Sequence, residues 1–197
     1  MNAVNIFVEG KSDKIFVSNF ISNNFNIHLS DDQFIIIGGC TLELISNRKN
    51  FFVENIENEI KNILIFDVVR NTFSETKNNL LQWMSQLEIE FKLFLFPNHK
   101  DNGNLETVLE NIALAEHKLI FDCSDNYQNC ISKHYNHYTL PNQKAKIYAY
   151  LEANTSKHKS ESINDEKRNY NSTELWNLKS EYLSPLKLFL SKHLFAE

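Results

Sequence analysis

The chain of 197 residues contains only four glycines and three prolines. Both counts are far below the usual share of these residues. So little glycine excludes a collagen-like chain, a glycine-rich low-complexity protein and a β-sandwich with many tight turns. It also makes the position of each glycine informative, because glycine is the residue used where the backbone turns sharply or approaches a ligand closely.

The sequence also lacks long apolar runs, a strong net charge and a cysteine framework. No apolar run is long enough to cross a bilayer, and the first residues lack the features of a signal peptide, so we expect a cytoplasmic protein without membrane contact. Three cysteines suit a reducing compartment. A formal net charge of −5 does not indicate a nucleic-acid binder, so such a partner would need a local basic patch or bridging metal ions.

Four short apolar segments alternate with amphipathic ones in the first part of the chain. The expected strands are residues 4–8, 34–37, 62–66 and 92–96, and the expected helices are residues 12–22, 41–60, 73–87 and 104–115. The strands are apolar throughout rather than alternating, which is typical of strands buried on both faces of a parallel sheet. The pattern predicts a compact α/β sandwich with a four-stranded, mainly parallel sheet flanked by helices.

The pattern changes after about residue 116. Residues 120–135, 141–153 and 183–195 have helical periodicity, whereas residues 154–172 are polar without an apolar period, which indicates a flexible loop. We therefore predict an α/β domain over residues 1–115. A helical C-terminal extension over residues 116–197 is expected to pack on it.

Acidic residues follow three of the expected strands. Glu9 and Asp13 follow the first strand, Asp67 follows the third, and Asp101 and Glu106 lie beyond the fourth. The carboxyl ends of parallel strands meet at one edge of a sheet, where ligands bind in such folds. Clustered carboxylates repel one another unless a hard divalent cation binds them. The sequence therefore predicts a Mg²⁺ or Mn²⁺ site, and a cation held there can polarise a phosphodiester.

The tripeptide Gly10-Lys11-Ser12 also invites comparison with a nucleotide-binding P-loop. That motif requires a glycine five residues before Gly10, and Asn5 stands there. The sequence therefore contains no phosphate-cradling loop of this kind.

The segment Val8-Glu9-Gly10-x-x-Asp13 resembles the opening motif of TOPRIM domains, which occur in topoisomerases, primases, small ribosomal-RNA maturases and OLD-family nucleases. Asp67 stands in the place of the first acid of the family's Asp-x-Asp motif. Four further segments resemble small stand-alone bacterial TOPRIM-related proteins of unknown function, so that the resemblance covers nearly the whole chain. They are Leu95–Glu106, Phe121–Cys123, Lys144–Tyr148 and Pro185–Leu190.

The resemblance implies roles for the acidic residues. Glu9 would be the general acid/base or a metal ligand, Asp67 a Mg²⁺ ligand, and Glu106 with Asp101 would complete the acidic set. Val69 departs from the family pattern, because it stands where the second acid of Asp-x-Asp is expected. Two functions follow: a Mg²⁺-dependent nuclease, or a catalytically degenerate module that binds DNA, RNA or an ATPase partner in a phage-defence or repair complex.

Three further residues flank the predicted site. Lys11, Asp13 and Arg70 are candidate contacts to phosphate or nucleic acid. Solvated surface charges at Lys11 and Arg70, and a helix-start role for Asp13, are alternative interpretations of the same positions.

The acidic residues also have structural interpretations. Glu9 is then a polar residue at a strand exit, Asp67 a cap of the following helix, and Glu106 a first-turn acid that interacts with the helix dipole. Asp101 is then an ordinary loop residue. The sequence alone leaves both sets of interpretations open.

Cys123, Tyr127, Cys130 and His134 share one face of an expected helix. Structural zinc sites use closer cysteine pairs, and free cysteine is among the most buried residue types. We therefore expect this face to pack in the core rather than to bind zinc.

Overall fold

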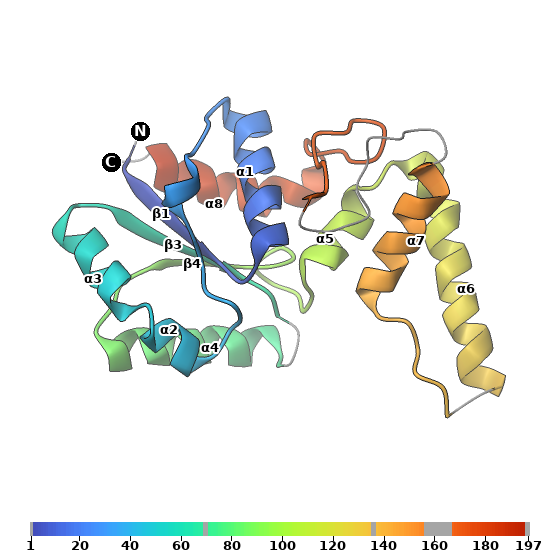
Figure 1. Ribbon diagram of the computed structural model, residues 1–197, viewed down its shortest axis with the longest axis horizontal. Helices are drawn as coiled ribbons and strands as arrows, with labels where there is room; N and C mark the ends of the chain where they lie inside the picture. The colour runs from blue at the N-terminus through green and yellow to red at the C-terminus, as the bar shows by residue number, and fades with distance from the viewer. Residues whose placement is uncertain (1, 69–70, 135–136, 156–166, 196–197) are drawn as a thin grey trace.

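The computed structural model describes residues 2–68, 71–134, 137–155 and 167–195 (Figure 1). Its centre is a four-stranded sheet of β1 (Val4–Val8), β2 (Phe34–Ile36), β3 (Lys61–Phe66) and β4 (Lys92–Leu95). The strand order is β2-β1-β3-β4 and every neighbouring pair is parallel. The predicted α/β fold with a four-stranded parallel sheet is confirmed.

Helices cover both faces of this sheet. One face packs against α1 (Lys11–Phe25), α5 (Leu105–Ile112) and α8 (Ser184–Phe195), and the other against α2 (Leu42–Ser46), α3 (Lys49–Glu57) and α4 (Phe73–Leu87). Successive strand residues therefore pack on opposite faces of the sheet. Ile6 and Val8 pack in the core with α1, α5 and α8, and Phe7 packs in the core with α2, α3 and α4. Two buried faces explain why the strands are mainly apolar, with Asn5 in β1 and Asn62 in β3 among the polar exceptions.

The helices α6 (Lys118–His134) and α7 (Gln143–Thr155) run side by side and project from the body of the molecule (Figure 1). Lys146 of α7 joins this hairpin to α5, because its Nζ lies 2.7 Å from a Glu110 carboxylate oxygen and 2.8 Å from an Asp125 one. α8 then returns to the sheet and packs in the same core as α1. Within the described ranges, no helix is long and apolar enough to cross a membrane.

The face of α6 that carries both cysteines is exposed, so the prediction that it packs in the core is wrong. Cys123 and Cys130 are exposed, and Tyr127 between them is 57% exposed. The opposite face packs instead, because Phe121 stacks on Tyr150 of α7 with ring centroids 4.8 Å apart. The helical period was correct, but it could not show which face has a partner.

The loop predicted near residues 154–172 falls largely on residues 156–166, which lie outside the described part of the chain. Beyond them, Arg168 and Tyr170 are buried. The Arg168 guanidinium lies 6.0 Å from the ring centroid of Tyr148 and 5.8 Å from that of Tyr170. This end of the predicted loop is therefore packed on the body of the protein.

A buried network of asparagines ties two strands to α3. The Asn62 side chain donates hydrogen bonds to the carbonyls of Phe52 (3.0 Å) and Glu90 (2.9 Å), and accepts one from the Asn55 side chain. Asn55 in turn accepts a 2.8 Å hydrogen bond from the Asn5 side chain. A buried polar network of this kind stabilises the fold only while its members remain paired.

We expect Asn62→Ala to lower the free energy of unfolding by about 3 kcal/mol, because the change leaves buried partners unpaired at roughly 1–3 kcal/mol each. Urea denaturation measures this loss. Asn78→Ala on the exposed face of α4 is the matched control and should change stability by less than about 0.5 kcal/mol. Equal stability of the two variants would contradict the role of the network.

Candidate functional site

All four glycines lie in loops at the carboxyl edge of the sheet or directly beside it. Gly10 follows β1, Gly38 and Gly39 follow β2, and Gly103 exchanges two backbone hydrogen bonds with Val68 after β3. Gly38 has a φ of 92° and Gly103 a φ of 151°, which side chains rarely adopt. At Gly103 an added Cβ would also lie 2.8 Å from the Thr107 hydroxyl oxygen. The scarce glycines therefore mark the edge where the acidic residues gather.

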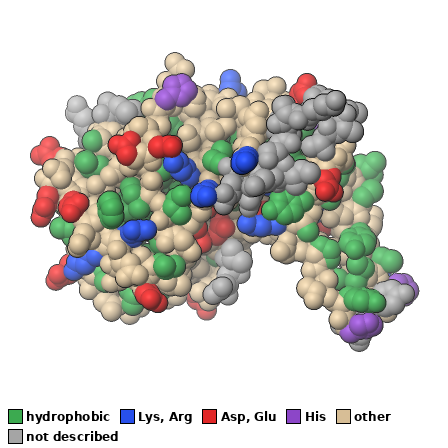
Figure 2. Space-filling view, in the orientation of Figure 1, with side chains coloured by type: hydrophobic (Ala, Val, Ile, Leu, Met, Phe, Trp, Pro, Cys, Tyr) green, Lys and Arg blue, Asp and Glu red, His purple; other side chains and the backbone are tan. Residues whose placement is uncertain are grey.

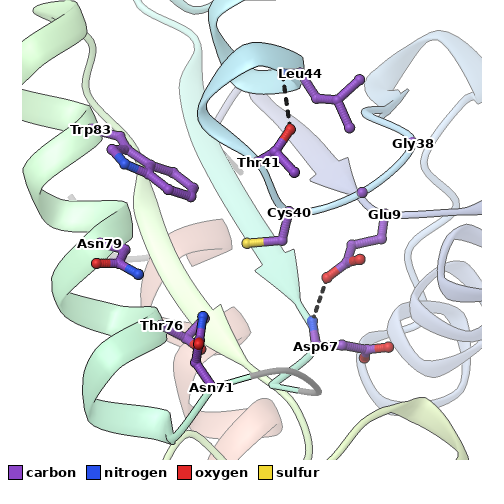
Figure 3. A pocket seen from close by; sticks show the side chains of 11 residues that line it. Glu9, Gly38, Cys40, Thr41, Leu44, Asp67, Asn71, Thr76, Asn79 and Trp83 are labelled. Atoms are coloured by element: carbon purple, nitrogen blue, oxygen red, sulfur yellow. Dashed lines mark hydrogen bonds between the residues drawn. The ribbon is translucent and has the colours of Figure 1, made fainter.

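Glu9 and Asp67 are joined at the ends of neighbouring strands. The Glu9 carboxylate accepts a 2.9 Å hydrogen bond from the Asp67 backbone N–H (Figure 3). The Asp67 carboxylate accepts a 3.2 Å hydrogen bond from the N–H of Leu105, the first residue of α5. Asp67 therefore contacts the start of α5 rather than α4, the helix that follows it in the sequence. These two bonds connect β1, β3 and α5.

Asp13 and Glu106 complete an acidic group with Glu9 and Asp67. Asp13 is 7% exposed and Glu106 is 8% exposed. The Asp13 carboxylate also accepts a 2.8 Å hydrogen bond from the Gly10 N–H, which holds it at the start of α1. All four acids line one cavity of about 210 Å³, which we call the acidic cavity.

Lys144 of α7 lines the same acidic cavity. It is the cationic group within the described part of the cavity wall, and its charge acts to lower the pKa of Asp13. The hairpin that projects from the body therefore delivers a positive charge to the carboxyl edge of the sheet.

The environment of these acids disfavours full ionisation. Burial, and then repulsion from Glu9 and Glu106, raises the pKa of Asp13 to about 7, against the opposing Gly10 hydrogen bond and Lys144. Burial, and then repulsion from Asp13, Glu9 and Glu106, raises the pKa of Asp67 well above its usual value. The site is therefore short of positive charge, which a proton or a cation would supply.

The donor set suits a hard divalent cation. Mg²⁺ prefers carboxylate oxygens and commonly binds through one or two of them together with waters and substrate phosphates. Among the described residues, no three His, Cys, Asp or Glu side chains are already placed to hold one ion between them. The geometry therefore fits a cation held by one or two carboxylates, rather than a preformed cage of three.

The other predicted site residues lie apart from the acidic cavity or outside the description. Asp101 is exposed and accepts a 2.8 Å hydrogen bond from the Asn98 side chain, and it lines no part of the cavity. Lys11 is exposed in the first turn of α1. Arg70 and Val69 lie outside the described residues. The structure thus brings four of the predicted acids together and leaves Asp101 on the surface.

A larger cavity of about 480 Å³ adjoins the acidic cavity (Figure 3). The two share Glu9, Asp67 and the Gly38-Gly39 turn. We call the larger one the tryptophan pocket; it is further lined by Cys40, Leu44, Asn71, Thr76, Asn79 and Trp83. Thr76, Asn79 and Trp83 reach it from one face of α4, at spacings of three and four residues.

Cys40 lies in this pocket in surroundings that favour the neutral thiol. Burial, followed by repulsion from Glu9 and Asp67, raises the pKa of the Cys40 thiol to about 12. Cysteine nucleophiles act as thiolates and occur where positive charge lowers the pKa. The surroundings of Cys40 therefore disfavour the thiolate form that a cysteine nucleophile needs.

Sequence reasoning missed Lys144 and Trp83. Lys144 lies on α7, and the sequence pattern identified only residues that follow strands. It therefore gave no reason to place Lys144 at the edge of the sheet. Trp83 could have been found from the sequence. The helix α4 was predicted with its observed bounds, and Thr76, Asn79 and Trp83 share one face of it. Only the packing of α4 beside the sheet edge shows that this face lines a pocket.

A family model described as "Protein of unknown function (DUF3226)" matches residues 4–195, which is nearly the whole chain. Neither the curated proteins nor the solved structures yielded a match.

We expect Asp13→Asn to make the metal-free protein more stable than the wild type at pH 8. The folded pKa of about 7 lies above the usual 3.8, so proton binding at Asp13 stabilises the fold below pH 3.8 and this contribution is lost as the pH rises through 7. Asparagine removes the charge and still accepts the Gly10 hydrogen bond. Thermal unfolding at pH 5 and pH 8 in EDTA should show a gain of several degrees at pH 8, since about 1 kcal/mol shifts Tm by roughly 2–4 °C.

The matched control is Asp101→Asn, which should not alter the change in Tm between pH 5 and pH 8, because Asp101 is exposed and outside the cavity. Identical pH profiles for wild type and Asp13→Asn would contradict the raised pKa.

Proposed function

The chain belongs to the DUF3226 family, and from its site we propose that it cleaves phosphodiester bonds of nucleic acid with the help of Mg²⁺ or Mn²⁺. The observation that carries this proposal is the gathering of Glu9, Asp13, Asp67 and Glu106 in one cavity beside Lys144. The resemblance of the β1 exit and of Asp67 to TOPRIM motifs supports the same function.

A divalent cation bound through one or two of Glu9, Asp67 and Glu106 would polarise the scissile phosphate. Glu9 is the group that moves a proton at the reacting oxygen, since the Asp67 N–H holds its carboxylate in a fixed orientation. Asp67 is in turn held by the Leu105 N–H. The protein thus positions both carboxylates by backbone donors, which do not change with protonation.

Asp13 and Lys144 line the same cavity and are the proposed contacts to the phosphate of the substrate. In the metal-free protein, burial and the neighbouring Glu9 and Glu106 raise the pKa of Asp13 to about 7. Its Oδ2 accepts the Gly10 N–H, so a proton held by Asp13 would reside on Oδ1. Lys144 supplies the positive charge that attracts a phosphate into an otherwise acidic cavity.

A non-catalytic binding module is the second candidate function. Two observations favour it: Val69 replaces the second acid of the motif, and no three described acidic, histidine or cysteine side chains already form a metal cage. Figure 2 shows hydrophobic side chains on the surface of the projecting part of the molecule, and in the hairpin Leu119 is 70% and Tyr138 57% exposed. A binding module with an ATPase partner would use such exposed apolar side chains for contact.

We expect Glu9→Gln to reduce cleavage by about 10²–10⁴-fold, because a positioned carboxylate that transfers a proton contributes that much to a rate. Glutamine keeps the oxygen that accepts the Asp67 N–H, so the fold is preserved. The measurement is cleavage of labelled single- and double-stranded DNA and RNA with Mg²⁺ or Mn²⁺.

Asp101→Asn is the control for this assay and should retain activity, because Asp101 lies outside the cavity. Equal activity of the wild type and Glu9→Gln would refute the mechanism. No cleavage and no Mg²⁺ binding by calorimetry, with nucleic-acid or partner binding retained, would select the binding module instead.

We expect Lys144→Gln to weaken nucleic-acid binding and to flatten its salt dependence. Loss of one phosphate contact lowers the slope of log K against log salt by about 0.7 for a single strand. Fluorescence anisotropy across a salt series measures the slope. Lys187→Gln, an exposed lysine on α8 outside the cavity, should leave the slope unchanged; an equal effect of both substitutions would remove Lys144 from the proposed contact.

A further inference from the structure

We propose that the tryptophan pocket binds one unstacked nucleobase of the strand whose phosphate lies in the acidic cavity. The proposal rests on the proposed function for the position of the phosphate, and it adds the substrate class: a single strand, or a strand end that can release a base. Its supports are the size of the pocket, the chemistry of its walls and its junction with the acidic cavity.

The size of the pocket suits a small aromatic ligand. Its volume of about 480 Å³ lies within the range of roughly 300–1,000 Å³ typical of small-ligand sites. It is more than twice as large as the acidic cavity of about 210 Å³. A nucleotide can therefore divide between the two, with its base in the larger space and its phosphate in the smaller one.

The walls of the pocket offer an aromatic surface and an apolar one. Figure 3 shows the Trp83 ring directed into the pocket from α4, with Cys40 and Leu44 on the loop and helix across from it. An aromatic side chain that faces a cavity is the common platform on which single-stranded binders stack a base. Trp83 is half-buried, so its ring is anchored in the protein and still accessible.

The polar groups of the pocket suit the edge of a base. Asn71 and Asn79 each carry an amide that donates and accepts, which is the pattern that asparagine uses toward base edges. Within the described residues, neither amide nor the Trp83 indole has a side-chain hydrogen-bond partner. Glu9 and Asp67 are the charged groups among the described lining residues, and they lie where the two cavities join. The interior therefore favours a neutral heterocycle over an anion.

The junction of the two cavities predicts which form of nucleic acid binds. Because Glu9 and Asp67 line both cavities, a base in the tryptophan pocket places its own phosphate beside the carboxylates. A base inside a duplex would first have to leave the stack, which costs free energy that a single strand does not have to supply. Single strands should therefore bind more tightly than duplexes of the same sequence.

The test is binding of a fluorescently labelled single-stranded oligonucleotide by anisotropy, with Ca²⁺ in place of Mg²⁺ so that the strand stays intact. We expect Trp83→Ala to weaken binding by roughly 5- to 150-fold, the loss that removal of a stacking side chain causes. Trp83→Phe keeps an aromatic ring and should bind within a few-fold of the wild type. Leu81→Ala, 40% exposed on α4 and outside the pocket lining, is the matched control and should have no effect.

Two further binding measurements show whether the bound base belongs to a single strand, a duplex or a free nucleotide. A matched duplex should bind more weakly than the single strand and be insensitive to Trp83→Ala. A free nucleoside monophosphate should compete only at concentrations far above the oligonucleotide; equal competition would overturn the assignment of the base to a strand. If Trp83→Ala and Trp83→Phe both bind the single strand as the wild type does, the pocket does not bind a base.

The outcome is separable from that of the nuclease proposal, because this assay requires no cleavage. Cleavage that depends on Glu9, together with binding that is indifferent to Trp83, would overturn the pocket proposal alone. Binding that depends on Trp83, without cleavage under any divalent cation, would overturn the nuclease proposal and leave the base pocket standing.

Discussion

The site depends on one constraint: carboxylates that repel one another are held together by backbone N–H donors. Glu9, Asp67 and Asp13 each accept one such hydrogen bond, from Asp67, Leu105 and Gly10 respectively. The parallel pairing of β1 with β3, in which Val8 lies opposite Ile65, brings Glu9 and Asp67 to neighbouring positions at the sheet edge. Because these donors belong to the backbone, the carboxylates cannot rotate away from each other without losing a bond.

The buried acids that form the candidate site also lower the stability of the metal-free fold. Buried acids with raised pKa values destabilise the metal-free fold at neutral and higher pH. In the proposed function, the acidic groups would favour binding of a cation, and Lys144 would favour binding of a phosphate in the same cavity. Other parts of the fold offset this destabilisation. They are the two apolar cores on the faces of the sheet and the buried asparagine network at the opposite end of β3.

The fold, which was predicted from neighbouring residues in the sequence, was confirmed, whereas the predicted packing of α6, which depended on contacts between distant residues, was not. Buried strands and the acids that follow them are local features, so the sheet and the positions of Glu9 and Asp67 at its edge could be predicted. The cysteine face of α6 shows the limit, because its period was correct but its partner was misjudged: Phe121 turns inward and Cys123 faces out. Asp101 was an acid in the right region, and a bond to Asn98 holds it on the surface.

The sequence by itself indicated the parallel sheet, since short, mainly apolar strands that alternate with helices are typical of strands buried on both faces of such a sheet. It also determined that the few glycines and the acids would share one edge, because both follow the strand ends. Only the tertiary structure decided which acids converge, that Lys144 of α7 lines the same cavity, and that Trp83 faces a pocket beside them. Those contacts join residues far apart in the chain, and their geometry depends on how helices pack on the sheet, which no local pattern encodes.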